Sequence, residues 1–311
     1  MKIAIMGAGG VGGYFGGLLA HSGQDVTFIA RGPHLQAIRE KGLQVKSVHG
    51  DVLVPDARAT DHPEEVGPVE LVLFATKTYQ TDDAAQAIKS LVSANTVILP
   101  LQNGVDAADR IGAVVGMEHL LGGVTWLSAA IEAPGVIGQY SPFRRIILGE
   151  LNGKTTPRVQ AIYQILKQTG AAVEVVDNIS EILWTKFVFI ASISAMGTLT
   201  RATIGEYRSV RETYAVLADA IGEVAAVARA KGVTLAPDIV ARTLSSIDQS
   251  PPGLKPSMQR DVEAERICEL ESMVGIIVQL GMELGVSTPV MRFAYAILKP
   301  GQLKVRGTSA S

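Results

Sequence analysis

The sequence predicts an α/β N-terminal domain, with a doubly wound and mostly parallel sheet, followed by an all-α C-terminal domain. In the first half, short apolar segments typical of buried strands alternate with segments of helical periodicity. From about Asn178 onward, long segments have helical periodicity with hardly any strand signal between them. We therefore expect two domains, at residues 1–170 and 171–311.

The first elements carry the most specific pattern. An apolar strand at residues 2–6 opens into Gly7-Ala8-Gly9-Gly10-Val11-Gly12, which fits G-x-G-x-x-G between a strand and a helix. The first glycine permits a tight turn, the second lets backbone approach a pyrophosphate, and the third lets the helix lie close to the sheet. Free N–H groups at the helix start favour phosphate. The pattern is typical of a Rossmann, dinucleotide-binding domain; a glycine turn that binds no ligand is the alternative.

The second strand, expected at residues 25–30, ends at Arg31. Enzymes specific for NAD place an acid at this point for the ribose 2′-hydroxyl, whereas an arginine suits the 2′-phosphate of NADP(H). We therefore expect NADP(H) to be bound by the glycine-rich turn and by Arg31. A solvated arginine that merely follows a strand is the alternative.

The following elements continue the alternation and place polar residues at strand ends. They are a helix at 33–41, strands at 43–48, 52–57 and 70–75, a helix at 80–91, strands at 96–99, 122–130, 135–139 and 145–148, and a helix at 157–168. Lys77, Gln102 and Asn103 come just after two of these strands. Ligands of doubly wound sheets bind beyond the carboxyl ends of the strands, so these three are candidate site residues.

The second half is expected to be helical. The predicted helices are at 180–196, 210–231, 236–246 and 264–284, and the tail after Lys299 is expected to fray. A cleft between two such domains is the expected place for a small substrate.

Composition excludes several classes of protein. Of 311 residues, 47% are apolar and 19% are charged, as in an ordinary globular protein. The net charge of −2 gives no electrostatic reason to expect nucleic acid or a membrane as partner. The single cysteine, Cys268, excludes an internal disulfide and a cysteine-rich metal site, so we expect a cytoplasmic protein without metal. The uncharged run at residues 187–200 is too short to cross a bilayer and predicts a buried helix.

Three residues of the helical half are candidates for chemistry. Lys186 lies near the start of a very apolar helix, where desolvation would lower its pKa toward a range useful for proton donation; a lysine that snorkels from a core helix is the alternative. Ser257 fits a helix N-cap, and Glu269 fits the solvated face of a helix. If both contact one small substrate, the helix must break near residues 262–266, because twelve residues of unbroken helix would separate them by about 18 Å.

Several short motifs follow one another along the chain in a characteristic order. They are the glycine-rich turn at residues 7–12, Arg31, Thr76-Lys77, Gln102-Asn103-Gly104, Pro134-Gly135, Glu181-x-x-Trp184-x-Lys186, Pro256-Ser257-Met258 with Asp261, and Glu269-x-Glu271 before Gly275. In these motifs the chain resembles the ketopantoate reductase (2-dehydropantoate 2-reductase) family over essentially its whole length. The resemblance implies an oxidoreductase that uses NADPH to reduce a 2-oxo acid to a 2-hydroxy acid. It implies ketopantoate as the substrate, the pantothenate pathway, and a homodimer formed through the helical domain.

The resemblance also implies a role for each motif residue. Lys186 would be the general acid that protonates the developing alkoxide, and Glu269 would accept a hydrogen bond from the distal hydroxyl of the substrate. Asn103 would lie at the nicotinamide and the substrate, with Lys77 as a second basic group nearby. Ser257 would bind the substrate carboxylate.

One departure from the family pattern concerns the substrate. The pantothenate-pathway enzymes carry asparagine four and eight residues after the catalytic lysine, on the same helix face, where this chain has Ile190 and Ser194. Isoleucine cannot hydrogen-bond a hydroxyl or a carboxylate, and a missing polar partner can shift preference by orders of magnitude. A related, more apolar 2-oxo acid is therefore an alternative substrate. A dehydrogenase of the hydroxy-acid or opine kind, and a dinucleotide sensor without catalysis, are further alternatives.

Overall fold

The computed structural model describes residues 1–309 and divides into two compact units. Unit 1 comprises Met1–Gln102 and Asp106–Ile179, and unit 2 comprises Asn103–Val105 and the chain from Ser180 onward. The sequence places the division at residue 170. The structure places it after Ile179, because strand β10 (Ala172–Val175) pairs in parallel with β9 (Val136–Glu150) of unit 1.

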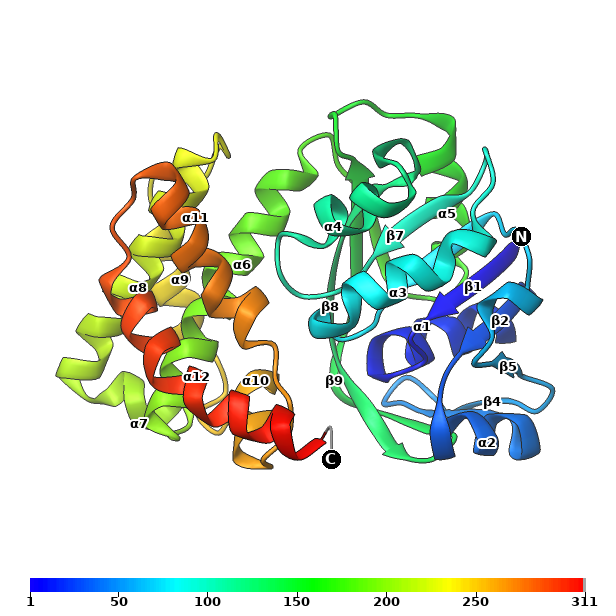
Figure 1. The fold of residues 1–311 in the computed structure, drawn as a ribbon, viewed down its shortest axis with the longest axis horizontal. Coiled ribbons are helices and arrows are strands. Elements are labelled where there is room, and N and C mark those ends of the chain that lie inside the picture. The colour runs from blue at the N-terminus through cyan, green and yellow to red at the C-terminus, as the bar shows by residue number, and fades with distance from the viewer. Residues whose placement is uncertain (310–311) are drawn as a thin grey trace. The chain divides into compact units, whose positions relative to one another are not determined.

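A five-stranded parallel sheet forms the centre of unit 1 (Figure 1). Its strands are β1 (Lys2–Met6), β2 (Asp25–Ile29), β5 (Arg58–Thr60), β6 (Leu71–Phe74) and β7 (Val97–Pro100), in the order β5-β2-β1-β6-β7. The strand order reverses between β1 and β6, and ligands of such sheets bind beyond the carboxyl ends at this point. Strands β6 and β7 are buried along their whole length, which explains their continuous apolar sequences.

A second, mixed sheet completes the strands of unit 1. Its members are β3 (Leu43–Lys46), β4 (Val52–Val54), β8 (Leu121–Ala133), β9 and β10, in the order β10-β9-β3-β4 with β8 paired to β9. The Rossmann fold class is confirmed, but the sequence does not predict β5 or β10. Both are short and half exposed, so neither shows the apolar run on which strand prediction depends.

Helices of unit 1 flank the sheets. They are α1 (Gly10–His21), α2 (Gly32–Lys41), α3 (Thr81–Ala87), α4 (Ala107–Val115) and α5 (Pro157–Lys167), with 3₁₀ turns at Pro63–Glu65, Thr78–Gln80, Ile88–Leu91 and Met117–His119. Helix α1 approaches the sheet so closely that a Cβ atom on Gly16 would lie 2.7 Å from Ile5 Cγ1. Glycine therefore fixes how deeply α1 lies on β1.

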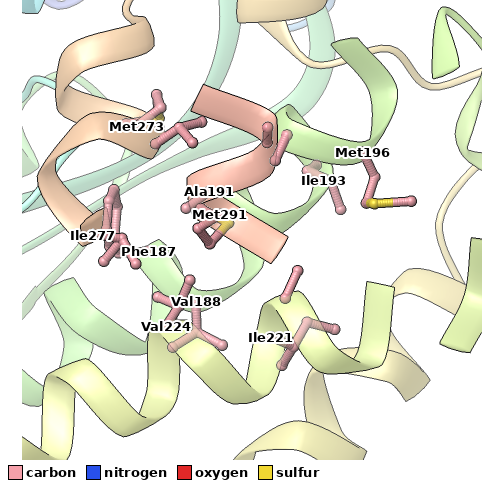
Figure 2. Close-up of a cluster of buried hydrophobic side chains, with 14 of the residues drawn as sticks. Phe187, Val188, Ala191, Ile193, Met196, Ile221, Val224, Met273, Ile277 and Met291 are labelled. Carbon is pink, nitrogen blue, oxygen red and sulfur yellow. The ribbon is translucent and has the colours of Figure 1, made fainter. Parts of the chain in front are cut away.

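The described residues of unit 2 form helices joined by loops, with no strand among them. Its elements are α6 (Ile179–Thr200), α7 (Ile204–Ser209), α8 (Arg211–Ala230), α9 (Ile239–Asp248), α10 (Ser257–Glu263), a π-helix η5 (Glu271–Gly275), α11 (Ile276–Leu284) and α12 (Pro289–Ser309). Figure 2 shows part of its core, where Phe187 and Val188 of α6 gather with Val224 of α8 and Met291 of α12. The all-α prediction for this half is confirmed.

Helix α6 is 22 residues long and is apolar enough to cross a membrane by length and composition alone. It extends well before the uncharged run at residues 187–200, so the length argument made from that run does not apply to the whole helix. Of its most apolar window, 61% is buried inside the protein, including Val188 and Ala191, which have no exposed surface. This burial is that of a core helix.

Helix α12 continues beyond the point where the sequence predicts fraying. Pro300 lies inside the helix, which runs to Ser309. Two side chains on either side of Pro300 attach this part of α12 to the segment before and within η5: Lys299 bonds Glu271, and Gln302 Oε1 accepts from the Cys268 N–H at 2.9 Å. These tertiary contacts hold the helix where local sequence favours an end.

Candidate active site

The glycine-rich turn follows β1 at the point where the strand order reverses. Gly7 has φ +94°, and a Cβ atom there would lie 2.8 Å from the backbone nitrogen of Thr76, just after β6. The N–H groups of Gly7 and Ala8 donate to Ile29 O at the end of β2, at 3.3 and 3.2 Å. The turn is therefore fixed to both neighbours of β1 by backbone contacts.

The glycines after Ala8 differ in the space around them: Gly9 adjoins open space, whereas Gly10 and Gly12 are closely packed. A Cβ atom built on Gly9, the N-cap of α1, meets nothing within 4 Å, so free space adjoins the start of the helix. On Gly10 and Gly12, by contrast, a Cβ atom would clash with Ala129 O and Gly7 O. Val11 is half-buried. Open space beside the orphan N–H groups of a helix start fits a phosphate, which is what the sequence predicts at this turn.

Arg31 follows β2 and is the N-cap of α2, with extended backbone (φ −139°, ψ 161°). Its side chain is exposed, and within residues 1–309 its guanidinium has neither an ion-pair nor a hydrogen-bond partner. A bidentate guanidinium in this state is suited to a phosphate group.

Gln102 connects the ends of β6 and β7. The side chain is buried, and its Nε2 donates to Thr76 O at 2.9 Å and to Thr81 Oγ1 at 3.0 Å. Gln102 thus holds the loop that carries Thr76 and Lys77. Lys77 itself is half-buried and precedes the 3₁₀ turn at Thr78–Gln80.

In unit 2, Lys186 and Asn103 are brought together from distant parts of the chain. Lys186 lies in α6, and its Nζ donates a hydrogen bond to Asn103 Oδ1 at 2.9 Å. Asn103 belongs to unit 2 although it directly follows Gln102 of unit 1, and Val105 packs against the core of unit 2. Gly104, with φ +99°, lets the chain turn between these two contacts.

The pKa of Lys186 is strongly perturbed. Burial of the ammonium lowers the pKa to about 8, and the charge of the Glu269 carboxylate acts in the opposite direction. Glu269 is itself buried. An amine that titrates close to neutral pH can give up and regain a proton during a reaction, which favours the proton-donor interpretation of Lys186 over a snorkelling lysine.

The helix is interrupted between Ser257 and Glu269, as expected if both residues contact one substrate. Helix α10 ends at Glu263, Glu265 has φ +51°, and the Arg266 N–H donates to Asp261 O at 2.8 Å. The helix predicted at 264–284 therefore begins later, with the π-helix η5 directly after Glu269 and Leu270. Single π-turns of this kind are frequent at functional sites.

Ser257 does not cap α10. Pro256 occupies the N-cap position, and Ser257 is the first helical residue, with a half-buried side chain. The N-cap alternative for Ser257 is wrong, because the extended backbone of Pro256 (φ −63°, ψ 157°) starts the helix one residue earlier than a serine cap requires.

Two further residues hold the predicted ones in place. His34 bonds the Ala8 carbonyl at 2.9 Å, and Gln302 holds the backbone just before Glu269. Sequence reasoning missed both, since neither belongs to a motif and their partners are distant in the chain. For Gln302 the only available signal was a polar residue on the apolar side of the last helix.

Comparison with known protein families gives a match in each of the two units. The family model described as ketopantoate reductase PanE/ApbA matches residues 3–153, and its C-terminal counterpart matches residues 178–302. The chain belongs to the ketopantoate reductase family. It is accordingly an oxidoreductase, and the family supports reduction of a 2-oxo acid with a nicotinamide cofactor.

Individual relatives cover almost the whole chain. The crystal structure of a ketopantoate reductase of this family from Ralstonia eutropha JMP134 is 31% identical, with a TM-score of 0.90 over 98% of this chain and 100% of that one. An oxidoreductase of Bacillus subtilis (strain 168), YkpB, named uncharacterized, is 29% identical over 96% of this chain and 98% of its own length. The ternary structure of D-mandelate dehydrogenase with NADH and anilino(oxo)acetate is 28% identical, with a TM-score of 0.89 over 98% of this chain and 100% of that one.

Proposed function

We propose that this enzyme reduces 2-dehydropantoate (ketopantoate) to pantoate with NADPH, in pantothenate biosynthesis. The observation that carries the proposal is Lys186, an amine with a pKa of about 8 that is hydrogen-bonded to Asn103 and acted on by the charge of Glu269. Unit 1 adds the open phosphate position beside Gly9 and the exposed Arg31. The family of the chain supports the reaction type.

Unit 1 supplies the cofactor contacts in this proposal. The N–H groups at the start of α1 bind the pyrophosphate in the space beside Gly9, and Arg31 binds the 2′-phosphate that distinguishes NADPH from NADH. A bound nicotinamide nucleotide supplies the hydride. D-mandelate dehydrogenase, a neighbour of similar fold, is seen with NADH. In this proposal Arg31 is the residue that makes the present chain prefer NADPH.

Unit 2 supplies the proton. Lys186 Nζ polarises the keto oxygen of the substrate and transfers a proton to it as the alkoxide forms, an effect that contributes about 10²- to 10⁴-fold to such reactions. Asn103 Oδ1 holds the amine in place through the 2.9 Å hydrogen bond. Because burial already lowers the pKa of the ammonium, the neutral amine left after the transfer costs little.

The remaining substrate contacts come from the other two motif residues. The Ser257 hydroxyl binds the substrate carboxylate, and the buried Glu269 carboxylate accepts a hydrogen bond from the distal hydroxyl. Lys77 and Asn103 contribute to the nicotinamide end of the cofactor. These assignments follow the family motifs, residue by residue.

A second candidate substrate is a 2-oxo acid with a hydrocarbon side chain. Ile190 lies one helical turn after Lys186, is half-buried, and packs against the core of unit 2. An apolar residue at this point suits an apolar substrate group. The structural neighbour seen with anilino(oxo)acetate is named D-mandelate dehydrogenase, and mandelate is a 2-hydroxy acid that carries a hydrocarbon group.

We also propose that the enzyme is a cytoplasmic homodimer that assembles through unit 2. Helix α12 exposes Phe293 and Ile297, four residues apart on one helix face, with 61% and 57% of their surface accessible. Sedimentation or light scattering of the purified protein tests the assembly, and a concentration-independent monomer contradicts it.

The activity is tested by oxidation of NADPH and NADH with a panel of 2-oxo acids, followed by the ultraviolet absorbance of the reduced nicotinamide. We expect turnover of ketopantoate with NADPH, and comparison with 2-oxoisovalerate and phenylglyoxylate decides between the two substrate candidates. Failure of folded protein to turn over any of them contradicts the proposal. Oxidation that also requires an amine indicates an opine-type enzyme instead.

A further inference from the structure

A buried histidine bridges two backbone segments of unit 1. His34, in the first turn of α2, has its Nε2 2.9 Å from Ala8 O, in the glycine-rich turn. Its Nδ1 lies 3.0 Å from the backbone nitrogen of Gly135, in the turn between β8 and β9. Only 8% of the residue is exposed.

The two contacts define the state of the ring. A backbone N–H can only donate, so Nδ1 must accept from Gly135 and carries no proton. The proton of the neutral imidazole therefore resides on Nε2, which donates to the Ala8 carbonyl. Burial also lowers the pKa of His34, which favours this neutral form.

The bond to Ala8 determines the direction of a neighbouring donor. In a planar trans peptide the C=O of one residue and the N–H of the next point in opposite directions. Holding the Ala8 carbonyl on His34 therefore turns the Gly9 N–H away from the imidazole. The N–H groups of Gly7 and Ala8 are already bonded to Ile29 O, and the space beside Gly9 is open.

We propose that His34 is a positioning residue for cofactor binding: its Nε2–H holds the peptide between Ala8 and Gly9 so that the Gly9 N–H faces the pyrophosphate. The inference rests on the proposed function, in that the glycine-rich turn binds a nicotinamide nucleotide. The bond to Gly135 has a different role, which is to fix the imidazole itself. The side-chain hydrogen bonds of His34 go to the backbone of Ala8 and Gly135, so its loss is expected to weaken the cofactor complex and to leave the chemical step unchanged.

Two substitutions separate the two bonds. In His34→Gln the side-chain nitrogen can occupy the place of Nε2 and still donate to Ala8 O, while the bond from Gly135 is lost. In His34→Asn the side-chain oxygen can occupy the place of Nδ1 and still accept from Gly135, while the bond to Ala8 is lost. His49→Asn is the matched control, because His49 Nε2 also bonds a backbone carbonyl of unit 1, Pro142 O at 2.8 Å, outside the glycine-rich turn.

The test measures the Kd of NADPH by fluorescence, together with kcat at saturating cofactor and the thermal unfolding midpoint. We expect His34→Asn to raise the Kd by about threefold to tenfold, the usual effect of one lost hydrogen bond, with kcat unchanged. His34→Gln should stay near the wild-type Kd, as should His49→Asn.

Equal Kd values in wild type and His34→Asn overturn the inference. Equal losses of affinity in His34→Asn and His34→Gln also overturn it, because they indicate a purely structural role. Wild-type protein that binds neither NADPH nor NADH contradicts the proposed function instead.

Discussion

The Lys186 ammonium donates a 2.9 Å hydrogen bond to the side-chain oxygen of Asn103, a residue 83 positions earlier in the chain. Asn103 directly follows Gln102, whose amide is bonded to Thr76, and a side chain at Gly7 would press on Thr76. In unit 2 the hydrogen bond therefore fixes the Lys186 amine, while in unit 1 Gln102 and the glycine-rich turn both adjoin Thr76. Substitutions at Lys186 and in the glycine-rich turn are expected to separate proton transfer from cofactor binding.

Reduction should depend on pH through Lys186. In the proposed mechanism the ammonium of Lys186, with a pKa of about 8, donates the proton, so kcat for reduction should fall as the pH rises through that value. The oxidation of a 2-hydroxy acid should show the opposite dependence, because it requires the neutral amine. Rate profiles in the two directions, measured with saturating substrates, check this expectation.

The same group affects stability with a defined sign. Unfolded lysine keeps its proton up to a pKa of 10.5, whereas folded Lys186 releases it at about 8. The unfolded state therefore binds more protons between these values, and the contribution of Lys186 to stability becomes more favourable as pH rises through this window. Unfolding of Lys186→Met by denaturant, compared with wild type, should lack this contribution; parallel stability profiles would contradict it.

Glu269→Gln should move the pH profile of kcat to lower pH. The carboxylate of Glu269 raises the pKa of Lys186, whereas burial lowers it. A neutral glutamine removes the raising effect, so the pKa of Lys186 should fall further. Glu271→Gln is the control, because Glu271 lies two residues later but bonds Tyr295 at 2.8 Å. A profile that moves upward, or that moves equally in both variants, would exclude Glu269 as the partner charge.

Arg31→Ala should discriminate between the two cofactors. Loss of a charge-assisted hydrogen bond to the 2′-phosphate should weaken NADPH binding by about 1.5–3 kcal/mol and leave NADH almost unaffected. Arg39→Ala, at a residue within α2 that is paired with Asp61, controls for charge alone. Titrations with both nucleotides measure the effect, and equal losses for NADPH and NADH would remove Arg31 as the 2′-phosphate reader.

Ile190→Asn should raise the turnover of ketopantoate relative to 2-oxoisovalerate. The amide restores a hydrogen-bonding group one turn after Lys186, and Ile190→Val provides a control that keeps the position apolar. The comparison uses kcat/KM for the two acids with each variant. A ratio that does not change would mean that position 190 does not contact the substrate side chain.

The sequence predicted the local features of this protein better than its long-range ones. The glycine-rich turn, the apolar strands β6 and β7, and the helical second half follow from patterns within a few residues. Lys186 was predicted as a perturbed amine because its immediate neighbours are apolar. A break before Glu269 was expected from helix geometry if Ser257 and Glu269 contact one substrate, and the structure has that break at Glu265, with φ +51°.

The features that were missed depend on distant partners. Strand β10 forms through pairing with β9, and α12 continues past Pro300 because Lys299 and Gln302 bond to the segment around Glu269. His34 has no local signal either, since its contacts come from a turn 26 residues earlier and another 101 residues later. Periodicity and propensity carry no information on such contacts.

The most direct test of the central claim is the rate of nicotinamide oxidation by Lys186→Ala at saturating NADPH and 2-oxo acid. The proton-donor role predicts a fall in rate of about 10²- to 10⁴-fold, with the Kd of NADPH unchanged. A variant that retains its rate within a fewfold of wild type would contradict the role. If wild type and Lys186→Ala both bind NADPH and neither turns over any 2-oxo acid, the protein is only a nucleotide-binding protein.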